Sequence, residues 1–561
     1  MSLDQNLQDF LRWRFSRRTA LKAGVGAALS SQALLLQDLS LEPARPALAA
    51  ASFSDIQFDI GRFLTQGPSN FDDGGGLVEA QFGPIFMLLT PARLTRNPTK
   101  ADQTTLANAL AQIEAVYAAA PSGLLIASVS YSLRYFNRLP ASLVAAHMPR
   151  LLSNTNRFAL EEAVPGPTDV VNGVVQGANG TIPKERFMVN VAIETNDLLF
   201  QFRSDSTFIL NDAITWLQGS NSLNGKQIPS PAFNGLLAFQ TPRLQFVQMG
   251  MPRRVADAAA QANPALYEFH TRMSQTSSMA MGFVDQQVDS SAPSAQTVTF
   301  VGDSHAKLTT ANPGDYFDNG SIAHFSHDID DMYQFLQTAA QDPTGGGGEP
   351  ATERIQYMFR SNQTGSGFFG LPENQTGDGF TNGGAPAFVN NVFQGTNAAQ
   401  LGAIAANGAA TAQTNTDPNR TFNGQQRLGH EAALQRSSRA ADGTPLHIRN
   451  DGPGFDGMDV PAFQTHPDMP SISTSAGAGT NQFKLQFLIF VPTAEFFRVM
   501  RVNVGAQDLM AQFGQPNDPN GTSGGVQFAD NGLERFITAT RRQNFLVPPR
   551  RHRAFPLLEL T

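Results

Sequence analysis

The sequence predicts an α+β fold made of two ferredoxin-like domains, each with an antiparallel sheet and peripheral helices. Three observations lead to this prediction. Strand and helix signals follow the order strand, helix, strand, strand, helix, strand twice along the chain. The chain has 561 residues, which is enough for two domains. One long stretch with little periodicity, residues 343–446, interrupts the second series.

The first series begins with an apolar run and continues into a segment with helical periodicity. Leu106, Leu110 and Ile113 recur at helical spacing in that segment. An Asp or Ser at the start of residues 205–217 suits a helix N-cap. We expect strands at residues 82–90, 122–130, 187–194, 197–203 and 244–249, and helices at residues 101–118 and 205–217.

The second series contains the strongest strand signal of the chain, the apolar run KLQFLIFV at residues 484–491. Asp328, Asp330 and Asp331 stand where a helix is expected to begin, and negative charge is favourable at a helix N-terminus. We expect strands at residues 297–302, 321–325, 484–491 and 543–547, and helices at residues 328–339, just after residue 491 and near residues 530–540.

These signals divide the chain into an N-terminal domain at residues 50–285 and a C-terminal domain at residues 286–561. The second domain contains the insertion at residues 343–446, which has four consecutive glycines and many Asn, Gln and Thr residues. A loop of this length is usually functional or unstructured. We therefore expect it to cover a cofactor pocket or to form mobile surface.

Residues 1–49 have the features of an export signal. The run SRRTALK at residues 16–22 resembles the twin-arginine consensus, and a short apolar stretch and an A-x-A site near Ala49 follow. The apolar stretch is too short to span a bilayer stably. We expect export in the folded state, a periplasmic or extracellular location, and no stable membrane span after processing.

Composition excludes several kinds of site. Cysteine is absent, which rules out disulfides, thiolate metal sites and thiol catalysis. The net charge is −8, so we expect no nucleic acid partner.

Two runs offer groups for chemistry on opposite sides of one site. GTPLHIR at residues 443–449 contains His447, whose imidazole could bind a metal, and GFVD at residues 282–285 contains the carboxylate of Asp285. Taken alone, a single histidine is more often a hydrogen-bonded structural residue, and Gly-x-x-Asp is more often a turn.

Six segments in order resemble motifs of the dye-decolourising (DyP-type) haem peroxidases, the exported enzymes of the deferrochelatase/peroxidase kind. The resemblance covers residues 53–561 apart from the insertion. The segments are SYSLRYF at residues 130–136, NDLLFQF at 196–202, GFVD at 282–285, NGSIA at 319–323, HIR at 447–449, and RFI at 535–537 followed by FLVPP at 545–549.

The resemblance implies a dimeric α+β barrel fold and a haem b cofactor bound by the C-terminal domain. It implies that His447 binds the haem iron from the proximal side and that Arg449 also contacts the cofactor. Asp285 would transfer a proton between the oxygens of hydrogen peroxide on the distal side. The expected function is that of an oxidoreductase, a haem-dependent peroxidase. Its partners would be hydrogen peroxide and a small organic reductant, and a homo-oligomer is compatible with this function.

Two departures from the family pattern weaken the expected activity. Gln286 replaces a glycine of the motif, and residues 450–483, where the family has its distal Arg, contain no Arg or Lys. Losing such a donor typically costs about 10²–10³ in rate, although Arg449 could substitute. The alternative is a catalytically weak or inactive haem-binding relative, or a haem-free relative, of the same fold.

The remaining histidines leave other hypotheses open. His430 is the rival proximal ligand, and His466 is a further candidate. His324 and His327 could bind a metal in a metal-assisted hydrolase. However, no third ligand, HExxH motif or nucleophile elbow accompanies them.

Overall fold

The computed structural model describes residues 54–59, 69–72, 77–80, 83–117, 123–166, 168–175, 187–231, 233, 235–248, 250–262, 270–271, 273, 279–281, 293–303, 307–335, 446–456, 484–504 and 536–561. Among the helices in these ranges, none has the length and apolar character needed to cross a membrane. The predicted export signal, the border between residues 285 and 286, and residues 343–445 of the insertion lie outside the described residues, so the domain limits remain predictions.

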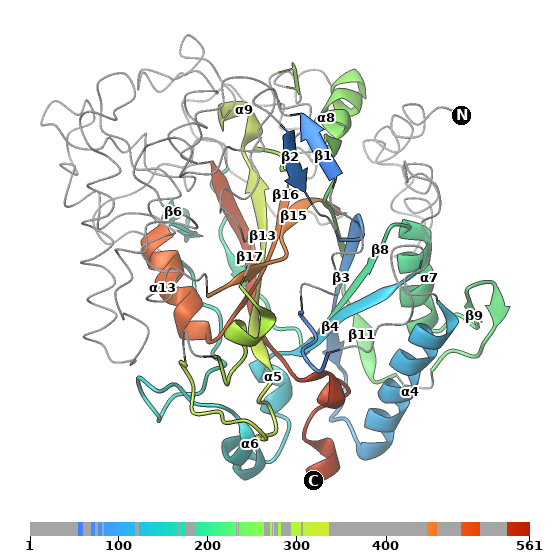
Figure 1. Cartoon of the computed structure of the whole chain (residues 1–561), viewed down its shortest axis with the longest axis vertical. Coiled ribbons are helices and arrows are strands. Elements are labelled where there is room, and N and C mark those ends of the chain that lie inside the picture. The colour runs from blue at the N-terminus through green and yellow to red at the C-terminus, as the bar shows by residue number, and fades with distance from the viewer. Residues whose placement is uncertain are drawn as a thin grey trace, which may run out of the picture.

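Eight strands of the described residues close into an antiparallel barrel (Figure 1). Around the barrel the order is β3-β12-β15-β16-β13-β17-β4-β8, and β8 pairs again with β3. The strands are β3 (Phe86–Leu94), β4 (Leu125–Tyr131), β8 (Leu198–Ser204), β12 (Arg243–Phe246), β13 (Ser321–Asp330), β15 (Gly452–Asp456), β16 (Lys484–Val491) and β17 (Ile537–Val547).

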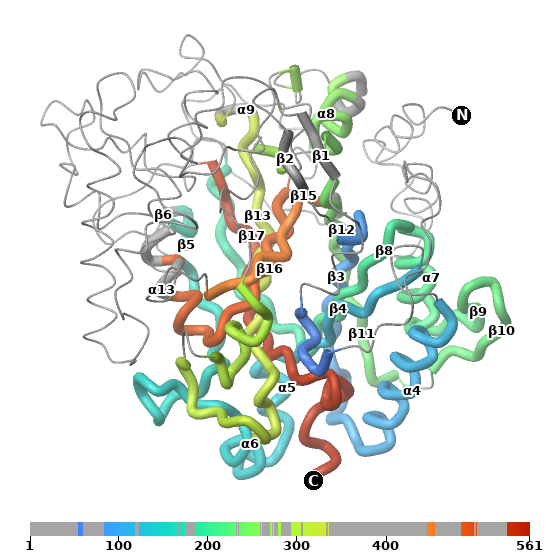
Figure 2. Tube along the Cα trace, viewed as in Figure 1, coloured from blue at the N-terminus to red at the C-terminus, as the bar shows by residue number. Residues whose placement is uncertain are grey.

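The barrel consists of two halves with the same topology, so the predicted pair of ferredoxin-like units is confirmed. In the first half the sheet order is β12-β3-β8-β4, and in the second it is β17-β13-β16-β15. Each half places its first strand beside its fourth and third strands, as the ferredoxin-like plan requires. The halves meet at two seams, β4 with β17 and β12 with β15. Figure 2 shows the blue-to-green first half beside the yellow-to-red second half.

Helices cover the outside of the barrel (Figure 1). In the first half these are α4 (Lys100–Val116) and α7 (Thr207–Leu217), and in the second half α13 (Ala494–Val504) follows β16. Thr99 and Asp102 form a capping box on α4, and the Ser206 hydroxyl accepts from Ile209 N at the start of α7. The predicted serine cap is therefore confirmed.

Shorter elements complete the described chain. They are β1 (Ser69–Asp72), β2 (Leu77–Ala80), α5 (Leu133–Phe136), α6 (Ala141–His147), β5 (Val170–Val171), β6 (Val174–Val175), β7 (Ala192–Ile193), β9 (Ser222–Leu223), β10 (Lys226–Gln227), β11 (Leu237–Phe239), α8 (Met251–Ala262), the 3₁₀ turn η3 (Ala295–Val298), α9 (Met332–Phe335), β14 (Ile448–Arg449), and the 3₁₀ turns η10 (Arg550–His552) and η11 (Leu558–Leu560). Three of them extend the barrel sheet, since β7 runs parallel to β17, β14 pairs with β16 and β11 pairs with β3.

Most predicted elements of the first half and the strand at residues 484–491 are confirmed, but of the strand predicted at residues 187–194 only β7 (Ala192–Ile193) is present. Three predictions for the second half were wrong. Residues 295–298 form a 3₁₀ turn instead of the start of a strand at 297–302. Residues 328–330 belong to β13, and the helix begins only at Met332. Residues 537–540 open β17 instead of ending a helix. The run Ile-Thr-Ala-Thr at that point is rich in β-branched residues, which suit a strand.

The barrel encloses both apolar and polar buried side chains. An apolar cluster there contains Phe58, Phe325 and Phe490. Arg243 of β12 places its guanidinium 4.4 Å from the centre of the Phe325 ring and donates to Glu194 at 2.5 Å. Because Arg243 belongs to the first half and Phe325 to the second, this side chain links the two halves across the lumen.

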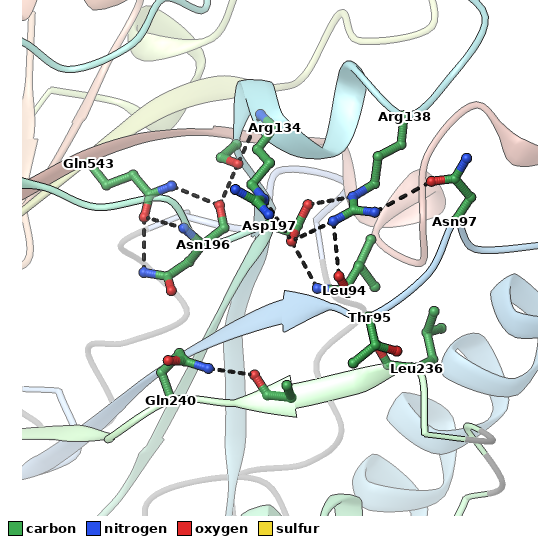
Figure 3. A network of polar contacts seen from close by, with 12 residues as sticks. Leu94, Thr95, Asn97, Arg134, Arg138, Asn196, Asp197, Leu236, Gln240 and Gln543 are labelled. Atoms are coloured by element: carbon green, nitrogen blue, oxygen red, sulfur yellow. Dashed lines mark hydrogen bonds and ion pairs between the residues drawn. The ribbon is translucent and has the colours of Figure 1, made fainter.

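A second link between the halves lies at the start of β8 (Figure 3). The backbone and side-chain N–H groups of Asn196 donate to Gln543 Oε1 at 3.2 and 3.0 Å, and Gln543 Nε2 donates to Asn196 O at 2.7 Å. The neighbouring Asp197 is fully buried and accepts from Arg138 and from Leu94 N. These contacts hold β8, β3 and β17 in one arrangement.

Candidate functional site

The outer faces of the two half-sheets differ in polarity. In the first half this face is apolar and buried against α4 and α7. Its residues in the main core cluster are Phe86, Leu88, Ile126, Leu198, Phe200, Phe202, Leu244 and Phe246. This is the ordinary packing of helices on a sheet, driven by the burial of apolar surface.

The outer face of the second half-sheet instead carries buried polar and ionisable side chains. On β13 the alternating residues His324, Ser326, Asp328 and Asp330 are between 0 and 4% exposed. We call polar face the set formed by these four residues with Arg542 and Asn544 of β17 and Arg449 of β14. Strand register joins them, because Arg449 pairs with Ile489, Ile489 with His324, and His324 with Asn544. Burying such groups costs free energy unless they are paired, so this face is a candidate functional site.

His324 is held as a neutral imidazole. Its Nδ1 lies 2.7 Å from Asn544 Oδ1, and its ring is stacked on Phe497 of α13 with centroids 3.6 Å apart. Since a carboxamide oxygen only accepts, Nδ1 carries the proton and Nε2 is the lone-pair nitrogen, 3.4 Å from Arg542 Nη1. Burial, and then the charge of Arg542, hold the pKa of His324 well below its usual value.

Arg542 is bound to Asp169 by a bidentate ion pair, at 2.6 and 2.7 Å. The amide N–H of Gly166 also donates to Asp169 at 2.6 Å. Burial alone would raise the pKa of Asp169, but the Arg542 charge and these hydrogen bonds outweigh it and lower the pKa to about 2. The ion pair is therefore charged at neutral pH.

Two aspartates of β13 have raised pKa values, in contrast to Asp169. Burial raises the pKa of Asp328, although Ser326 Oγ donates to its carboxylate at 2.8 Å and Arg542 lies nearby. Burial raises the pKa of Asp330 much further, and the charges of Asp328, Asp451 and Asp331 add to this effect. Within the described residues, Oδ1 of Asp330 has no hydrogen-bond partner.

Arg449 is the member of the polar face that β14 contributes, and His447 stands two residues before it in the sequence. His447 immediately precedes β14 and is 2% exposed, whereas Arg449 is partly exposed and pairs in register with Ile489 of β16. The two residues are separated by two positions in the sequence, so their Cα atoms are at most about 7 Å apart. Asp285, Gln286, His430 and His466 lie outside the described residues, so the predicted opposition of His447 and Asp285 stays a prediction.

The hypothesis of a metal bound by His324 and His327 receives no support. The two residues are three apart on β13, so alternation places them on opposite faces. His327 Nδ1 lies 2.5 Å from Thr540 Oγ1, while His324 is bonded to Asn544. Among the side chains that the structure describes, no group of three or more His, Asp or Glu residues could hold a metal ion.

Sequence reasoning missed Arg542, Asp169 and Asp330 as members of the site. The sequence gives a hint of a site at Arg542 and at Asp330, since each is a charged residue inside a run with strand character. The sequence around Asp169 gives no such hint, because its partner Arg542 is 373 residues away.

No family model matches this sequence, and no curated protein is similar to it. Solved structures with a similar chain path are DyP-type peroxidases. A putative DyP-type peroxidase from Shewanella oneidensis has a TM-score of 0.39 and 13% identity, over 84% of this chain and 94% of that chain. The encapsulated DyP-type peroxidase from Mycobacterium smegmatis has a TM-score of 0.40 and 13% identity, over 84% and 96%. A Rhodococcus jostii DypB variant in complex with heme has a TM-score of 0.38 and 11% identity, over 84% and 95%. Similarity at this level does not show which reaction this chain catalyses or which cofactor it binds.

Proposed function

We propose that this protein is a haem-dependent peroxidase, an oxidoreductase that oxidises organic substrates with hydrogen peroxide. The observation that carries the proposal is the contrast between the two half-sheets. One outer face is apolar and packs against helices. The other carries buried ionisable groups, and β14, which His447 immediately precedes, contributes Arg449 to it. Of the motifs that resemble those of the DyP-type peroxidases, NGSIA, HIR and the RFI–FLVPP pair fall on β13, β14 and β17 of this second half-sheet.

The side chains of His447 and Arg449 fit a b-type haem. Iron in a chain without cysteine would be bound by His, Tyr or Met, and His447 offers a buried imidazole. Arg449 offers a partly exposed guanidinium, which suits a propionate carboxylate. His447 would therefore bind the iron and Arg449 would bind a propionate. When bound, haem supplies the oxidising centre that reacts with peroxide.

The protein's own groups would handle protons and charge. Asp285 accepts the proton of the near oxygen of hydrogen peroxide on its carboxylate and returns it to the far oxygen, as a general base and then a general acid. The Arg542–Asp169 pair fixes the position of β17 within the polar face.

An absorption spectrum of the purified protein tests the proposal. A Soret band that is lost in His447→Ala, but retained in the matched variant His430→Ala, supports His447 as the ligand. The reverse result assigns the iron to His430. Stopped-flow mixing with peroxide should show a slower reaction in Asp285→Asn, which keeps the shape of the side chain and removes the base.

A second function is favoured by the two departures from the family pattern, Gln286 and the lack of Arg and Lys at residues 450–483. These changes suit a protein that binds haem with little turnover. A Soret band without peroxide-driven dye oxidation would support this binding role. The absence of a Soret band after haem loading would rule out both functions and leave a haem-free relative of the fold.

We infer further that the chain is exported in the folded state by the twin-arginine route to the periplasm or beyond. Arg17 and Arg18, the apolar stretch and the A-x-A site support this inference. Uptake of a cofactor before export would be consistent with this route. The expected substrates are hydrogen peroxide and a small organic reductant.

A further inference from the structure

Residues 54–59 are packed among the strands of the barrel, although they belong to no helix or strand. Phe58 is fully buried in the apolar cluster that the barrel encloses, and its ring is stacked on Phe490 of β16 with centroids 5.0 Å apart. The neighbouring Gln57 is 1% exposed. A stretch without regular structure therefore occupies a place between strands of both halves.

The seam between β4 and β17 has a gap in its pairing next to this segment. The two strands pair at Leu546 and Tyr131. Two residues on from Leu546 and two residues back from Tyr131, the antiparallel register sets Pro548 opposite Val129. Proline has no N–H group and cannot donate to the carbonyl of Val129. The usual pair of ladder hydrogen bonds therefore cannot form at this point.

The carboxamide of Gln57 takes the place of the missing pairing. The N–H of Val129 donates to Gln57 Oε1 at 3.1 Å, and Gln57 Nε2 donates to the carbonyls of Val129 at 3.2 Å and Pro548 at 2.8 Å. Buried backbone groups are rarely left unpaired, and here one side chain satisfies them on both sides of the seam. Gln57 thus joins β4 of the first half to the end of β17 of the second half.

Asp55 fastens the same segment to the turn that follows β17. Its carbonyl accepts from Arg550 N at 2.6 Å, and its carboxylate accepts from Arg551 N at 3.0 Å and from Asn319 Nδ2 at 3.1 Å. The guanidinium of Arg551 also pairs with this carboxylate. The segment is thus anchored by a carboxylate, a carboxamide and a phenyl ring within four consecutive residues.

We propose that residues 54–59 are an internal peptide ligand of the β4–β17 seam, a clasp that closes the barrel there and detaches locally while the rest of the chain stays folded. The partner that the seam fits is an extended peptide with acidic, carboxamide and aromatic side chains at its first, third and fourth positions, and the chain supplies this peptide itself. A short segment outside helices and strands opens more easily than a core strand, because its release breaks no strand ladder. Release withdraws the ring of Phe58 and exposes the apolar cluster to solvent.

Thiol labelling under native conditions tests this local opening. The chain has no cysteine, so an engineered cysteine is its only thiol. Ala323→Cys places the thiol on β13, in the apolar cluster that contains Phe58. Ala213→Cys places it on α7, in the separate core cluster between sheet and helices. Both alanines are at most 1% exposed, so labelling at either position reports an opening of the structure.

Gln57→Ala removes the hydrogen bonds of the carboxamide across the seam. It should speed the labelling of Ala323→Cys by at least about tenfold and leave that of Ala213→Cys unchanged. The matched control Gln240→Ala, whose side chain donates to Ala238 O, should change neither rate. Equal acceleration at both positions would show that Gln57 stabilises the whole fold and would overturn the clasp. An unchanged rate at Ala323→Cys would overturn it as well.

Hydrogen exchange of the unmodified chain is a second readout, which does not depend on the folding of any variant. The amide of Val129 is bonded to Gln57, whereas the amide of Ile214 lies inside α7. Exchange at Val129 should depend little on low concentrations of urea, while exchange at Ile214 should accelerate with urea because it requires an unfolding that exposes more surface. The same urea dependence at both amides would contradict local detachment. Both measurements use the chain without added haem, so their outcome does not depend on the proposed function.

Discussion

Arg542 and Asp169 form a bidentate ion pair between side chains that are 3 and 2% exposed and 373 residues apart in the sequence. The pair connects β17, the last strand of the barrel, to a segment that precedes β8 in the first half. Arg501 of α13 lies 3.9 Å from the same carboxylate. One buried anion therefore organises three separate parts of the chain around the polar face.

We expect Asp169→Asn to destabilise the protein strongly. Removing one partner of a buried pair leaves the other charge uncompensated, which typically costs about 3–5 kcal/mol. Urea unfolding at pH 7 measures this loss. Asp257, which pairs with Arg253 and His270, is the control, because its side chain is 40% exposed and Asp257→Asn should cost only about 1 kcal/mol. Equal losses in the two variants would contradict a buried, charged pair.

The same pair predicts a pH dependence. Because folding lowers the pKa of Asp169 to about 2, its contribution is fully present above the unfolded-state value and is lost as pH falls from about 4 towards 2. The Asp169→Asn variant should lack this part of the acid-induced loss. Urea midpoints of both proteins across this range provide the measurement.

Gln543 should be essential for the contact between the two halves (Figure 3). Gln543→Leu keeps the approximate size of the side chain but leaves two N–H groups and the carbonyl of Asn196 without their partner. Each buried group left unpaired costs about 1–3 kcal/mol, so we expect a loss of at least about 3 kcal/mol in the free energy of unfolding. Gln240→Leu is the control, since the side chain of Gln240 donates to Ala238 O, two residues away, and the residue is partly exposed.

The order of elements could be predicted from sequence because most strands and helices carry their own periodicity. Residues 484–491 form β16 without any shift, and the helix at residues 101–118 is α4. The prediction failed at Asp328 and Asp330, whose charges suggested the start of a helix. Both are buried in β13, where tertiary contacts decide the structure and local preference does not.

The candidate site could be predicted only in part. His447 and Arg449 were recognisable because they stand in one short motif, and the structure places Arg449 in register with the polar face. The Arg542–Asp169 pair depends on the closure of the barrel, which no local pattern encodes. The raised pKa of Asp330 depends first on its burial, which no local pattern encodes either.

Export should depend on the two arginines of the N-terminal motif. Replacing both Arg17 and Arg18 by Lys keeps the charge but removes the twin-arginine pair, so the precursor should accumulate in the cytoplasm. Cell fractionation and immunoblotting measure its distribution. Lysine replacements at Arg12 and Arg14 serve as a control and should leave export intact. Normal export of the Arg17/Arg18 variant would contradict export by the twin-arginine route.

Gly454 should be irreplaceable at the seam between β12 and β15. It pairs with Gln245 of β12 and Lys484 of β16. A Cβ atom at Gly454 would lie 2.7 Å from Gln486 Cγ and 2.8 Å from Leu244 O. The side chain could move, but the carbonyl belongs to the backbone of β12, so Gly454→Ala must push β15 away from its partner and weaken one of the two seams that close the barrel.

We expect Gly454→Ala to cost about 1–3 kcal/mol or more, as overpacking of a buried site does. Thermal and urea unfolding measure the loss, and hydrogen exchange should increase at the amides that pair β12 with β15. Gly166→Ala is the control, because the nearest atoms to its Cβ lie at 3.4 Å, an ordinary contact distance, and belong to side chains. If Gly454→Ala were as stable as this control, with unchanged exchange at the seam, the close approach of β12 and β15 would be wrong.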